Sequence, residues 1–279
     1  MLNVLKSGFY TTVQDTGRFG YRDKGVPVSG IMDMETVYKI NMLLENDQNA
    51  AVLEITMTGP TLEFEEDTFI ALGGAELSIT LNNQPVSNYV VIKVKAGDIL
   101  SYGRLKKGFR AYLGIKEGFQ TPKVLGSRSY YSSITPNGII KDKAEINYKK
   151  YSFFEPKITG LKVDSILDEK VLHVAKGPEF ELLTDKQLEN LFFKDFTVAM
   201  ENNRMAYQLD ETIDSHSISM LTSATLPGTV QFTPSGKLII LMKDGQTTGG
   251  YPRILQLTDK AISILAQKKS GDHFSFKLI

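Results

Sequence analysis

Leu77-Ser-Ile-Thr-Leu81, followed at once by Asn82-Asn83, is the stretch that most directly predicts the fold of this chain. Its apolar and polar residues alternate, which is typical of a strand with one buried and one solvent-facing side. Asparagine tolerates positive φ, so the Asn pair indicates a hairpin turn after the strand. The sequence therefore predicts antiparallel β structure in this region.

Similar short apolar segments recur along the chain and are separated by Gly, Asn, Asp and Pro. Strands are expected at residues 52–57, 68–72, 89–94 and 110–115. This spacing favours barrels or sandwiches over repeated βαβ units. Three helices are expected as well: residues 32–45 with Asp33 as N-cap, a helix opened by the Thr184-Asp-Lys-Gln187 capping box, and residues 258–267.

Composition narrows the class of partner. The chain has 279 residues, with 32 basic and 32 acidic side chains and no cysteine. Balanced charge gives no reason to expect a nucleic acid or an anionic membrane as partner. The lack of cysteine excludes disulfides, thiolate metal sites and a Cys nucleophile. No signal peptide or membrane-spanning run is recognisable, so a cytoplasmic protein with small-molecule or protein partners is expected.

A weak internal repeat suggests two related halves. Val52-Leu-Glu-Ile with the later Gly59-Pro60 resembles Val171-Leu-His-Val with Gly177-Pro178. In the same order, Lys-Ala-Gly-Asp98 resembles Lys-Ser-Gly-Asp272. A duplication would explain both pairs, and chance matching of common turn sequences is the alternative. We expect two β-rich domains, residues 1–155 and 156–279.

The stretch Asp244-Gly-Gln-Thr-Thr-Gly-Gly-Tyr-Pro-Arg253 is the first candidate site. It follows the apolar run Leu238–Met242, which is typical of a buried strand, and a strand end leading into a Gly-rich polar loop is a common place for a site. The alternative is a tight connection in which glycine supplies positive φ and proline fixes the next φ. Spacing alone leaves both interpretations open.

The second candidate site is the N-terminal run that contains Gln14, Asp15 and Arg18. Arg18 can grip a carboxylate or phosphate with two hydrogen bonds, and Asp15 can act as a base. Alternatively, Asp15 and Arg18 pair with each other. The three histidines are scattered without metal-ligand spacing, so no metal site is expected. The cluster Asn203–Leu209 has the composition of an ordinary loop.

Several motifs together resemble the family of the C-type subunit of 5-oxoprolinase, also described as KipA-like, allophanate hydrolase subunit 2 or the biotin-dependent carboxyltransferase A/B domain. The motifs that carry the resemblance are Thr-Thr-Val-Gln-Asp-Thr-Gly-Arg-Phe-Gly20, Gly-Val-Pro-Val-Ser-Gly30, Leu-Glu-Ile-Thr56, Gly-Ser-Arg-Ser129, Pro-Gly-Thr-Val-Gln231 and Asp-Gly-Gln-Thr-Thr-Gly-Gly-Tyr-Pro252. The resemblance covers nearly the whole chain. It implies a mainly β fold of two cyclophilin-like β-barrel halves.

The resemblance also implies a function. Family members work with a KipI-like protein and a LamB/YcsF-type protein, which are the other two subunits, and together they open 5-oxoproline to glutamate with ATP. ATP, with Mg²⁺, is the expected cofactor, and biotin is not expected. The residues carried over as catalytic are Asp15, Arg18, Glu54 and Asp244. Those carried over as substrate- or nucleotide-binding are Gln14, Arg128, Arg204, Gln231, Gln246, Thr247, Thr248, Gly249, Gly250 and Tyr251.

This chain departs from the family pattern in two places. Tyr-Tyr-Ser-Ser-Ile-Thr-Pro136 replaces the usual continuation after Gly-Ser-Arg-Ser129, and Gln208 stands where an arginine is usual. Losing an arginine removes a charge from an anion site, which puts full 5-oxoprolinase activity in question. A KipA-like regulatory protein that binds the KipI-like protein is therefore the main alternative. A biotin-dependent carboxyltransferase or an allophanate hydrolase component is a further alternative.

Overall fold

The computed structural model describes residues 1–279, and the chain divides into two compact units. The first unit contains residues 1–18 and 29–165, and the second contains residues 19–28 and 166–279. The boundary expected between residues 155 and 156 differs from this division, which falls later in the chain. The segment 19–28, which includes a short 3₁₀ helix at Arg22–Lys24, belongs to the second unit although it lies near the N-terminus.

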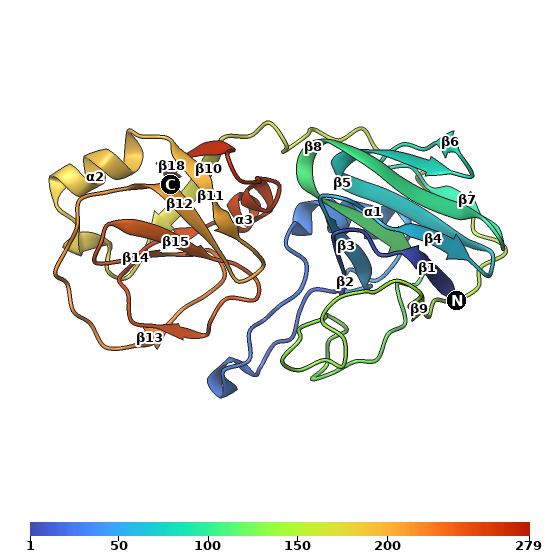
Figure 1. The fold of residues 1–279 in the computed structure, drawn as a ribbon, viewed down its shortest axis with the longest axis horizontal. Helices are drawn as coiled ribbons and strands as arrows, with labels where there is room; N and C mark the ends of the chain where they lie inside the picture. The colour runs from blue at the N-terminus through green and yellow to red at the C-terminus, as the bar shows by residue number, and fades with distance from the viewer. The chain divides into compact units, whose positions relative to one another are not determined.

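The first unit is built on a curled antiparallel sheet, drawn in blue to green in Figure 1. Six strands follow the order β2-β3-β8-β4-β1-β9, and β5 pairs with β6, β7 and β8. The strands are β1 (Leu2–Lys6), β2 (Tyr10–Gln14), β3 (Val52–Thr56), β4 (Thr61–Phe64), β5 (Thr68–Leu81), β6 (Gln84–Pro85), β7 (Ile92–Val94), β8 (Ile99–Ile115) and β9 (Glu145–Ile146).

The long strands β5 and β8 pair along most of their length and give the sheet its curl. Their register shifts at three places between Gly74 and Ile79, and such bulges bend and twist a strand pair. The expected segments 68–72 and 77–81 are therefore parts of one strand. Asn82 and Asn83 have φ of 50° and 66°, which confirms the turn after it. Tyr89 has φ of 59°, so the strand expected at 89–94 begins only at β7.

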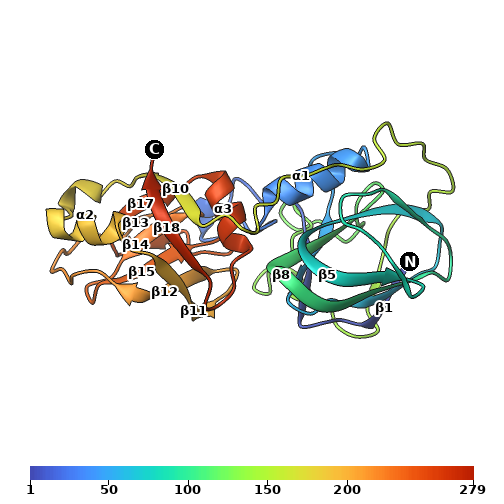
Figure 2. The same cartoon turned by 90° about the horizontal axis from the view of Figure 1, so that it is seen from above.

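Helix α1 (Met34–Leu43) covers the outer face of this sheet, as Figure 2 shows. The side chain of Asp33 accepts a hydrogen bond of 3.0 Å from the Thr36 N–H, which confirms the expected N-cap. The helix packs on β5 and β8 through an apolar cluster on the outer face of the curled sheet: Val37, Ile40, Leu43, Leu44, Phe69, Ala71 and Tyr112.

The second unit is a closed barrel with the strand order β10-β17-β14-β15-β12-β11-β18. The parallel pair β10–β18 closes it, and the other neighbours in the order are antiparallel. The barrel strands are β10 (Val171–Lys176), β11 (Phe196–Asn202), β12 (Ala206–Thr212), β14 (Thr229–Phe232), β15 (Lys237–Leu241), β17 (Arg253–Leu257) and β18 (His273–Leu278). The mainly β fold is confirmed, with one closed barrel and one curled sheet.

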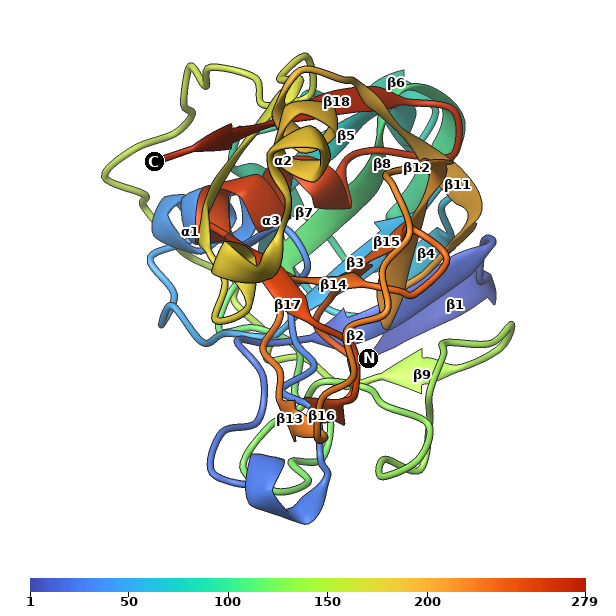
Figure 3. The same cartoon turned by 90° about the vertical axis from the view of Figure 1, so that its left-hand side faces the viewer.

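Two helices and a small ribbon complete the second unit. Helix α2 (Asp185–Phe192) begins at the expected capping box, and α3 (Asp259–Ala266) is capped by Thr258. Another 3₁₀ turn lies at Phe180–Leu182. The short strands β13 (Ser223–Ala224) and β16 (Thr248–Gly249) pair outside the barrel, as Figure 3 shows. The three α-helices of the chain are all too short to span a bilayer.

One repeated segment forms the same turn in both units. Gly97 and Gly271 both have φ of 86°. The carboxylate of the following aspartate accepts a hydrogen bond from the backbone N–H three residues earlier, at 2.7 Å for Asp98 and 2.9 Å for Asp272. The glycine is needed because this φ is costly for residues with a Cβ. This part of the sequence repeat therefore corresponds to a repeated structure.

Candidate functional site

Asp15 follows directly after β2 and ties two loops of the first unit together. Its Oδ1 accepts hydrogen bonds from the hydroxyls of Ser127 and Ser129, at 2.5 and 2.7 Å, and from the N–H of Gly17 at 2.9 Å. Its Oδ2 accepts a hydrogen bond of 2.7 Å from the backbone N–H of Arg128. Four donors thus satisfy a carboxylate that is 1% exposed, so the ion pair with Arg18 considered from the sequence is wrong.

Arg18 is also buried, and it supports the same loop from another side. Its Nη2 donates to the carbonyl oxygen of Ser129 at 2.5 Å, and its Nε donates to that of Val124 at 3.4 Å. The loop that carries Arg128 is therefore fixed by a buried carboxylate and a buried guanidinium. A loop held in this way presents its side chains in a fixed orientation, as binding sites require.

A cavity of about 370 Å³ opens beside this loop. Arg128 is held at its wall, because its Nη2 donates to Gln120 Oε1 at 3.0 Å and its Nη1 donates to the Thr121 carbonyl. Lys123 and Lys149 add two more cations to the lining. The residues around the cavity are Asp15, Asp47, Asn49, Ala50, Ala51, Glu117, Phe119, Gln120, Lys123, Arg128 and Lys149. Three carboxylates, from Asp15, Asp47 and Glu117, balance these three cations, and Lys149 pairs with Glu117 at 3.5 Å. Arg128 and Lys123 are the cations of this lining that could meet a carboxylate or phosphate of a ligand.

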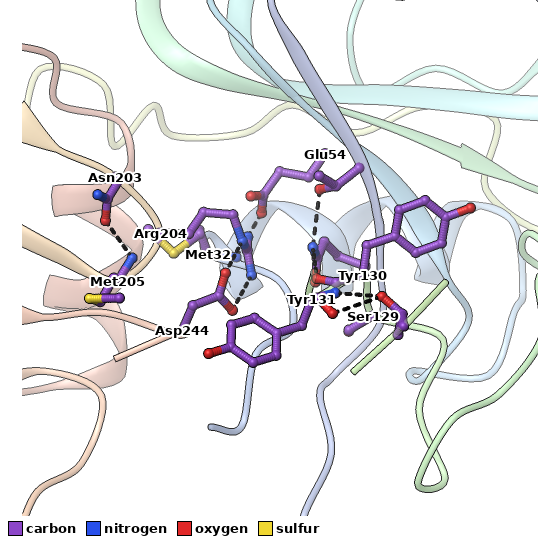
Figure 4. A network of polar contacts seen from close by, with 12 residues as sticks. Met32, Glu54, Ser129, Tyr130, Tyr131, Asn203, Arg204, Met205 and Asp244 are labelled. Carbon is purple, nitrogen blue, oxygen red and sulfur yellow. Dashed lines mark hydrogen bonds and ion pairs between the residues drawn. The ribbon is translucent and has the colours of Figure 1, made fainter. Parts of the chain in front are cut away.

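Glu54 lies in a different network of the first unit, at the start of helix α1. Its Oε2 accepts hydrogen bonds from the Met32 N–H at 2.8 Å, drawn in Figure 4, and from the Tyr112 hydroxyl at 3.0 Å. Arg110 lies 3.8 Å from its Oε1, and both side chains are buried. Burial, with the charges of Glu54 and Asp33, raises the pKa of Tyr112 well above its ordinary value. Glu54 does not line the cavity beside Asp15.

In the second unit, Asp244 forms an ion pair with Arg204 (Figure 4). The two side chains make a fork: Nε to Oδ2 at 2.9 Å and Nη2 to Oδ1 at 3.2 Å. The backbone N–H of Asp244 also donates to the Arg204 carbonyl at 2.8 Å. This pairing joins the β11–β12 turn to the loop after β15. The turn around residue 204 is thus fixed to the start of the 244–253 loop.

In the 244–253 loop, Gly249 is needed for close packing and not for positive φ. Neither Gly249 nor Gly250 has a left-handed φ. The tight-turn interpretation, in which glycine supplies positive φ, is therefore wrong. A Cβ on Gly249 would lie 2.2 Å from Gln231 Nε2 and 2.9 Å from Gln246 Nε2. A Cβ on Gly250 would meet no atom closer than the Thr222 hydroxyl at 4.0 Å. Gly249 therefore makes room for two glutamine amides.

Polar contacts hold the backbone of this loop in place. Thr225 Oγ1 donates to the Gln246 carbonyl at 2.5 Å, and the Thr225 N–H donates to the Thr247 carbonyl at 3.0 Å. Arg22 and Arg253 donate to the Thr225 and Ala224 carbonyls. The loop is thus rigid in its backbone although its side chains at Gln246, Thr248 and Tyr251 are exposed.

Glu179 fixes Arg253 at the end of the loop. The carboxylate accepts hydrogen bonds of 2.9 Å from Nε and 2.7 Å from Nη2. It also accepts one of 2.8 Å from the Arg253 backbone N–H. These hydrogen bonds from Arg253 hold the pKa of Glu179 below its ordinary value. No sequence pattern indicated this partner, because Glu179 lies in a separate segment.

Gln14 and Gln231 lie in a similar short sequence pattern, one in each unit. Val-Gln14-Asp-Thr-Gly-Arg and Val-Gln231-Phe-Thr-Pro-Ser-Gly-Lys share a Val-Gln-x-Thr pattern. Gln14 is the last residue of β2, and Gln231 is the residue before the last of β14. Gln14 is fully buried, and its Nε2 donates to Thr12 and Tyr130 while its Oε1 has no partner. Gln231 is 1% exposed, and its Nε2 has no partner. Buried polar atoms without partners are rare in native proteins.

The structure thus gathers the expected residues into separate groups. Asp15, Arg18 and Arg128 meet in the first unit, and Gln231, Gln246 and Gly249 meet in the second, where Arg204 and Asp244 form a further pair. Thr247 contributes a backbone carbonyl, and Thr248 belongs to the β13–β16 ribbon. Sequence reasoning missed Lys123, Lys149 and Thr225. The Gly-Ser-Arg-Ser129 motif was the available signal for the two serines.

Sequence comparison identifies the class of domain to which this fold and these loops belong. The family described as carboxyltransferase domain, subdomain A and B, matches residues 24–278. The chain therefore belongs to this carboxyltransferase domain family. It is 34% identical over 283 residues to the C-type subunit of 5-oxoprolinase from Escherichia coli (strain K12), and this match covers 99% of the chain and 90% of the relative.

Other relatives are parts of longer proteins. The chain is 39% identical over 304 residues to urea amidolyase of Saccharomyces cerevisiae, a match that covers 99% of the chain and 16% of that relative. The solved structure of TTHA0988 superposes with a TM-score of 0.89 at 23% identity, over 99% of this chain and 56% of that chain, and shares the fold. The Kluyveromyces lactis urea amidolyase structure has a TM-score of 0.87 at 28% identity, over 99% and 18% of the two chains.

Proposed function

We propose that this protein is part of an ATP-dependent 5-oxoprolinase that opens 5-oxoproline to glutamate. The observation that carries the proposal is the match over the whole chain to two proteins named as the C-type subunit of 5-oxoprolinase, at 34% and 31% identity. That name implies further subunits, and the proposed partners are a KipI-like protein and a LamB/YcsF-type protein. The use of ATP fits the cytoplasmic location expected from the sequence.

The chemistry explains why such a reaction needs ATP. A five-membered lactam is a stable amide that water attacks slowly. Transfer of the γ-phosphoryl group to the lactam oxygen releases ADP and leaves an electrophilic carbon. Water adds to that carbon, the C–N bond breaks, and phosphate departs, which leaves glutamate. Cations and backbone N–H groups around the phosphoryl oxygens would stabilise the charge that develops during transfer.

The cavity beside Arg128 is the place that we propose for the phosphate oxygens. Arg128 is already oriented by Gln120 and Thr121, and Lys123 adds positive charge at the same cavity. We assign Arg128 and Lys123 to the ATP phosphates, and Asp15 and Arg18 to positioning the Arg128 loop. No group of three or more acidic or histidine side chains is gathered for a metal ion, so Mg²⁺ would arrive with the nucleotide.

Carboxyl transfer is the second candidate function, and the 39% identity to a urea amidolyase favours it. Urea and 5-oxoproline both contain a carbonyl group bonded to N–H, so related sites can recognise either. A carboxyltransferase would depend on a carboxylated biotin supplied by other proteins. The two candidates therefore differ in their dependence on biotin, which an experiment can measure.

The test is coexpression of the chain with its KipI-like and LamB/YcsF-type partners. The proposal expects ATP hydrolysis and glutamate formation that both depend on 5-oxoproline and persist when avidin sequesters biotin. A stable complex without any 5-oxoproline-dependent ATP hydrolysis would instead support a KipA-like regulatory role. Loss of activity on addition of avidin would support carboxyl transfer.

A further inference from the structure

The amide of Gln231 is the buried polar group that the fold explains least. The side chain is 1% exposed, and its Nε2 has no hydrogen-bond partner. Leaving a buried donor without a partner costs stability, whereas an apolar side chain of the same shape does not. The buried Gln231 amide therefore opposes folding, and residues that violate folding rules in this way are common at functional sites.

The Gln231 amide contacts an exposed side chain, that of Gln246, which a ligand could displace. Gln246 donates from its Nε2 to Gln231 Oε1 at 3.3 Å, and its side chain is exposed. Because Gly249 has no Cβ, the Gln231 and Gln246 amides both pack directly against its backbone, so departure of the Gln246 amide would open space beside Gln231 Nε2. Because Thr225 fixes the backbone at Gln246 and Thr247, the Gln246 side chain can leave by rotating its own bonds while the loop stays in place.

We propose that the Gln231 amide recognises a ligand whose N–H and C=O point to the same side, a lactam or a urea, and that the Gln246 amide occupies this place when the ligand is absent. The ligand N–H would donate to Gln231 Oε1, and the ligand carbonyl would accept from Gln231 Nε2. Two parallel hydrogen bonds then satisfy both atoms of a buried amide, whereas Gln246 satisfies one. This proposal rests on the proposed function and specifies its substrate class.

Geometry makes the recognition selective. A trans amide, such as a peptide bond, directs its N–H and C=O to opposite sides and can form only one of the two bonds. A lactam methylated on nitrogen has no N–H and also loses one bond. 5-Oxoproline and urea, the compounds in the names of the relatives, both offer the required pair.

Gln14 shows why the proposal concerns the second unit alone. It lies in the same Val-Gln-x-Thr pattern in the first unit, but its Nε2 already donates to Thr12 Oγ1 at 3.0 Å and to the Tyr130 carbonyl at 3.3 Å. Its Oε1 is the atom without a partner. An amide with an occupied donor cannot bind a lactam by two parallel hydrogen bonds, so the two copies of the Val-Gln-x-Thr segment differ in this respect.

Ligand-observed NMR titration of the full chain tests the proposal. The ligands are 5-oxoproline, urea, N-methyl-5-oxoproline and the trans amide N-methylacetamide. The wild-type chain should bind the first two, and N-methyl-5-oxoproline about tenfold or more weakly than 5-oxoproline, because a site built for an N–H rejects the analogue without it. Equal binding of 5-oxoproline and its N-methyl analogue, or no binding of 5-oxoproline, would overturn the proposal.

Three variants make the test specific. Gln231→Met should keep or raise the melting temperature and weaken 5-oxoproline binding about tenfold or more. Gln246→Ala removes the competing amide and should strengthen binding about two- to fivefold. Gln256→Met is the matched control, because the Gln256 amide is fully partnered by Thr229 and the Pro227 carbonyl. It should lower the melting temperature and leave the discrimination against the N-methyl analogue intact.

The variants also separate this proposal from the proposed function. If the wild-type complex turns over 5-oxoproline and Gln231→Met leaves kcat/KM unchanged, the amide site is wrong and the function stands. If binding follows the expected pattern but the complex shows no turnover, the site stands and the function is wrong. If Gln231→Met does not fold, two measurements still test the proposal. One is 5-oxoproline binding by Gln246→Ala, whose substitution is at an exposed position, and the other is binding of N-methyl-5-oxoproline by the wild type.

Discussion

Asp15 and Gln231 are buried polar side chains with opposite hydrogen-bonding states. The Asp15 carboxylate accepts hydrogen bonds from two hydroxyls and two backbone N–H groups, whereas the Gln231 amide leaves its nitrogen without a partner. The first arrangement stabilises a loop, and the second leaves capacity for a ligand. Residue type alone does not distinguish them, since both were expected to be site residues.

Asp15→Asn should therefore destabilise the first unit. The substitution removes the charge and turns one acceptor into a donor facing other donors, and a loss of about 3 kcal/mol in the free energy of unfolding is expected. Denaturation by guanidinium chloride measures it. Asp142→Asn is the control, because Asp142 also accepts hydrogen bonds from Ser7 but lies exposed, and it should change stability little. Unchanged stability of the Asp15 variant would contradict its assignment as the anchor of the Arg128 loop.

The Glu179–Arg253 pair should give a pH-dependent contribution to stability. Hydrogen bonds from the Arg253 side chain hold the pKa of Glu179 below its ordinary value of 4.5 in the folded state. A carboxyl with a lowered folded pKa stabilises the fold above its unfolded pKa, and this contribution disappears as the pH falls through the folded pKa. The melting temperature of Glu179→Gln should thus lie below that of the wild type at about pH 7, and the two should converge below pH 4.5.

An exposed ion pair in the same unit serves as the control. Glu181 pairs with Lys176 at 2.8 Å, but its side chain is 78% exposed, so Glu181→Gln should have little effect at either pH. The side chains of Glu179 and Arg253 are 16% and 18% exposed, which is why their pair should matter more. A gap between wild type and Glu179→Gln that persists at low pH would show that the loss comes from packing instead.

At the scale of elements, the 244–253 loop contains two adjacent glycines whose substitution by alanine should affect stability differently. Gly249→Ala places a Cβ 2.2 Å from Gln231 Nε2, and overpacking of this kind costs about 1–3 kcal/mol. Gly250→Ala meets nothing closer than 4.0 Å and should stay within about 0.5 kcal/mol of the wild type. Chemical denaturation of the two variants compares them directly. Equal effects would mean that close packing on Gln231 is not the reason for Gly249.

Local elements were the most predictable part of the structure. The capping box at Thr184, the N-cap at Asp33 and the Asn82-Asn83 turn depend on neighbouring residues, so sequence patterns were sufficient. Long strands were less predictable, because a bulge keeps a strand continuous through Gly74 although the alternation of side chains breaks there. The partner of Arg253 was not predictable, because tertiary packing brings Glu179 to it.

For the whole molecule, the internal repeat predicted two β-rich units, and the structure shows one curled sheet and one closed barrel. The sequence could not predict that only the second unit closes into a barrel, because closure depends on which strands pair across the sheet rather than on their local patterns. The segment 19–28 belongs to the second unit for the same reason: its Arg22 contacts Thr225, which is distant in sequence. The expected function came from the family resemblance, whose motifs are spread over both units.

The most direct test of the proposed function is the stoichiometry of products from the complex coexpressed with both partners. With 5-oxoproline and ATP present, and with avidin added, we expect one glutamate for each ADP and no ADP above background when 5-oxoproline is omitted. ADP formation that is independent of 5-oxoproline, or glutamate formation that stops when avidin is added, would contradict the assignment of this chain to an ATP-dependent 5-oxoprolinase.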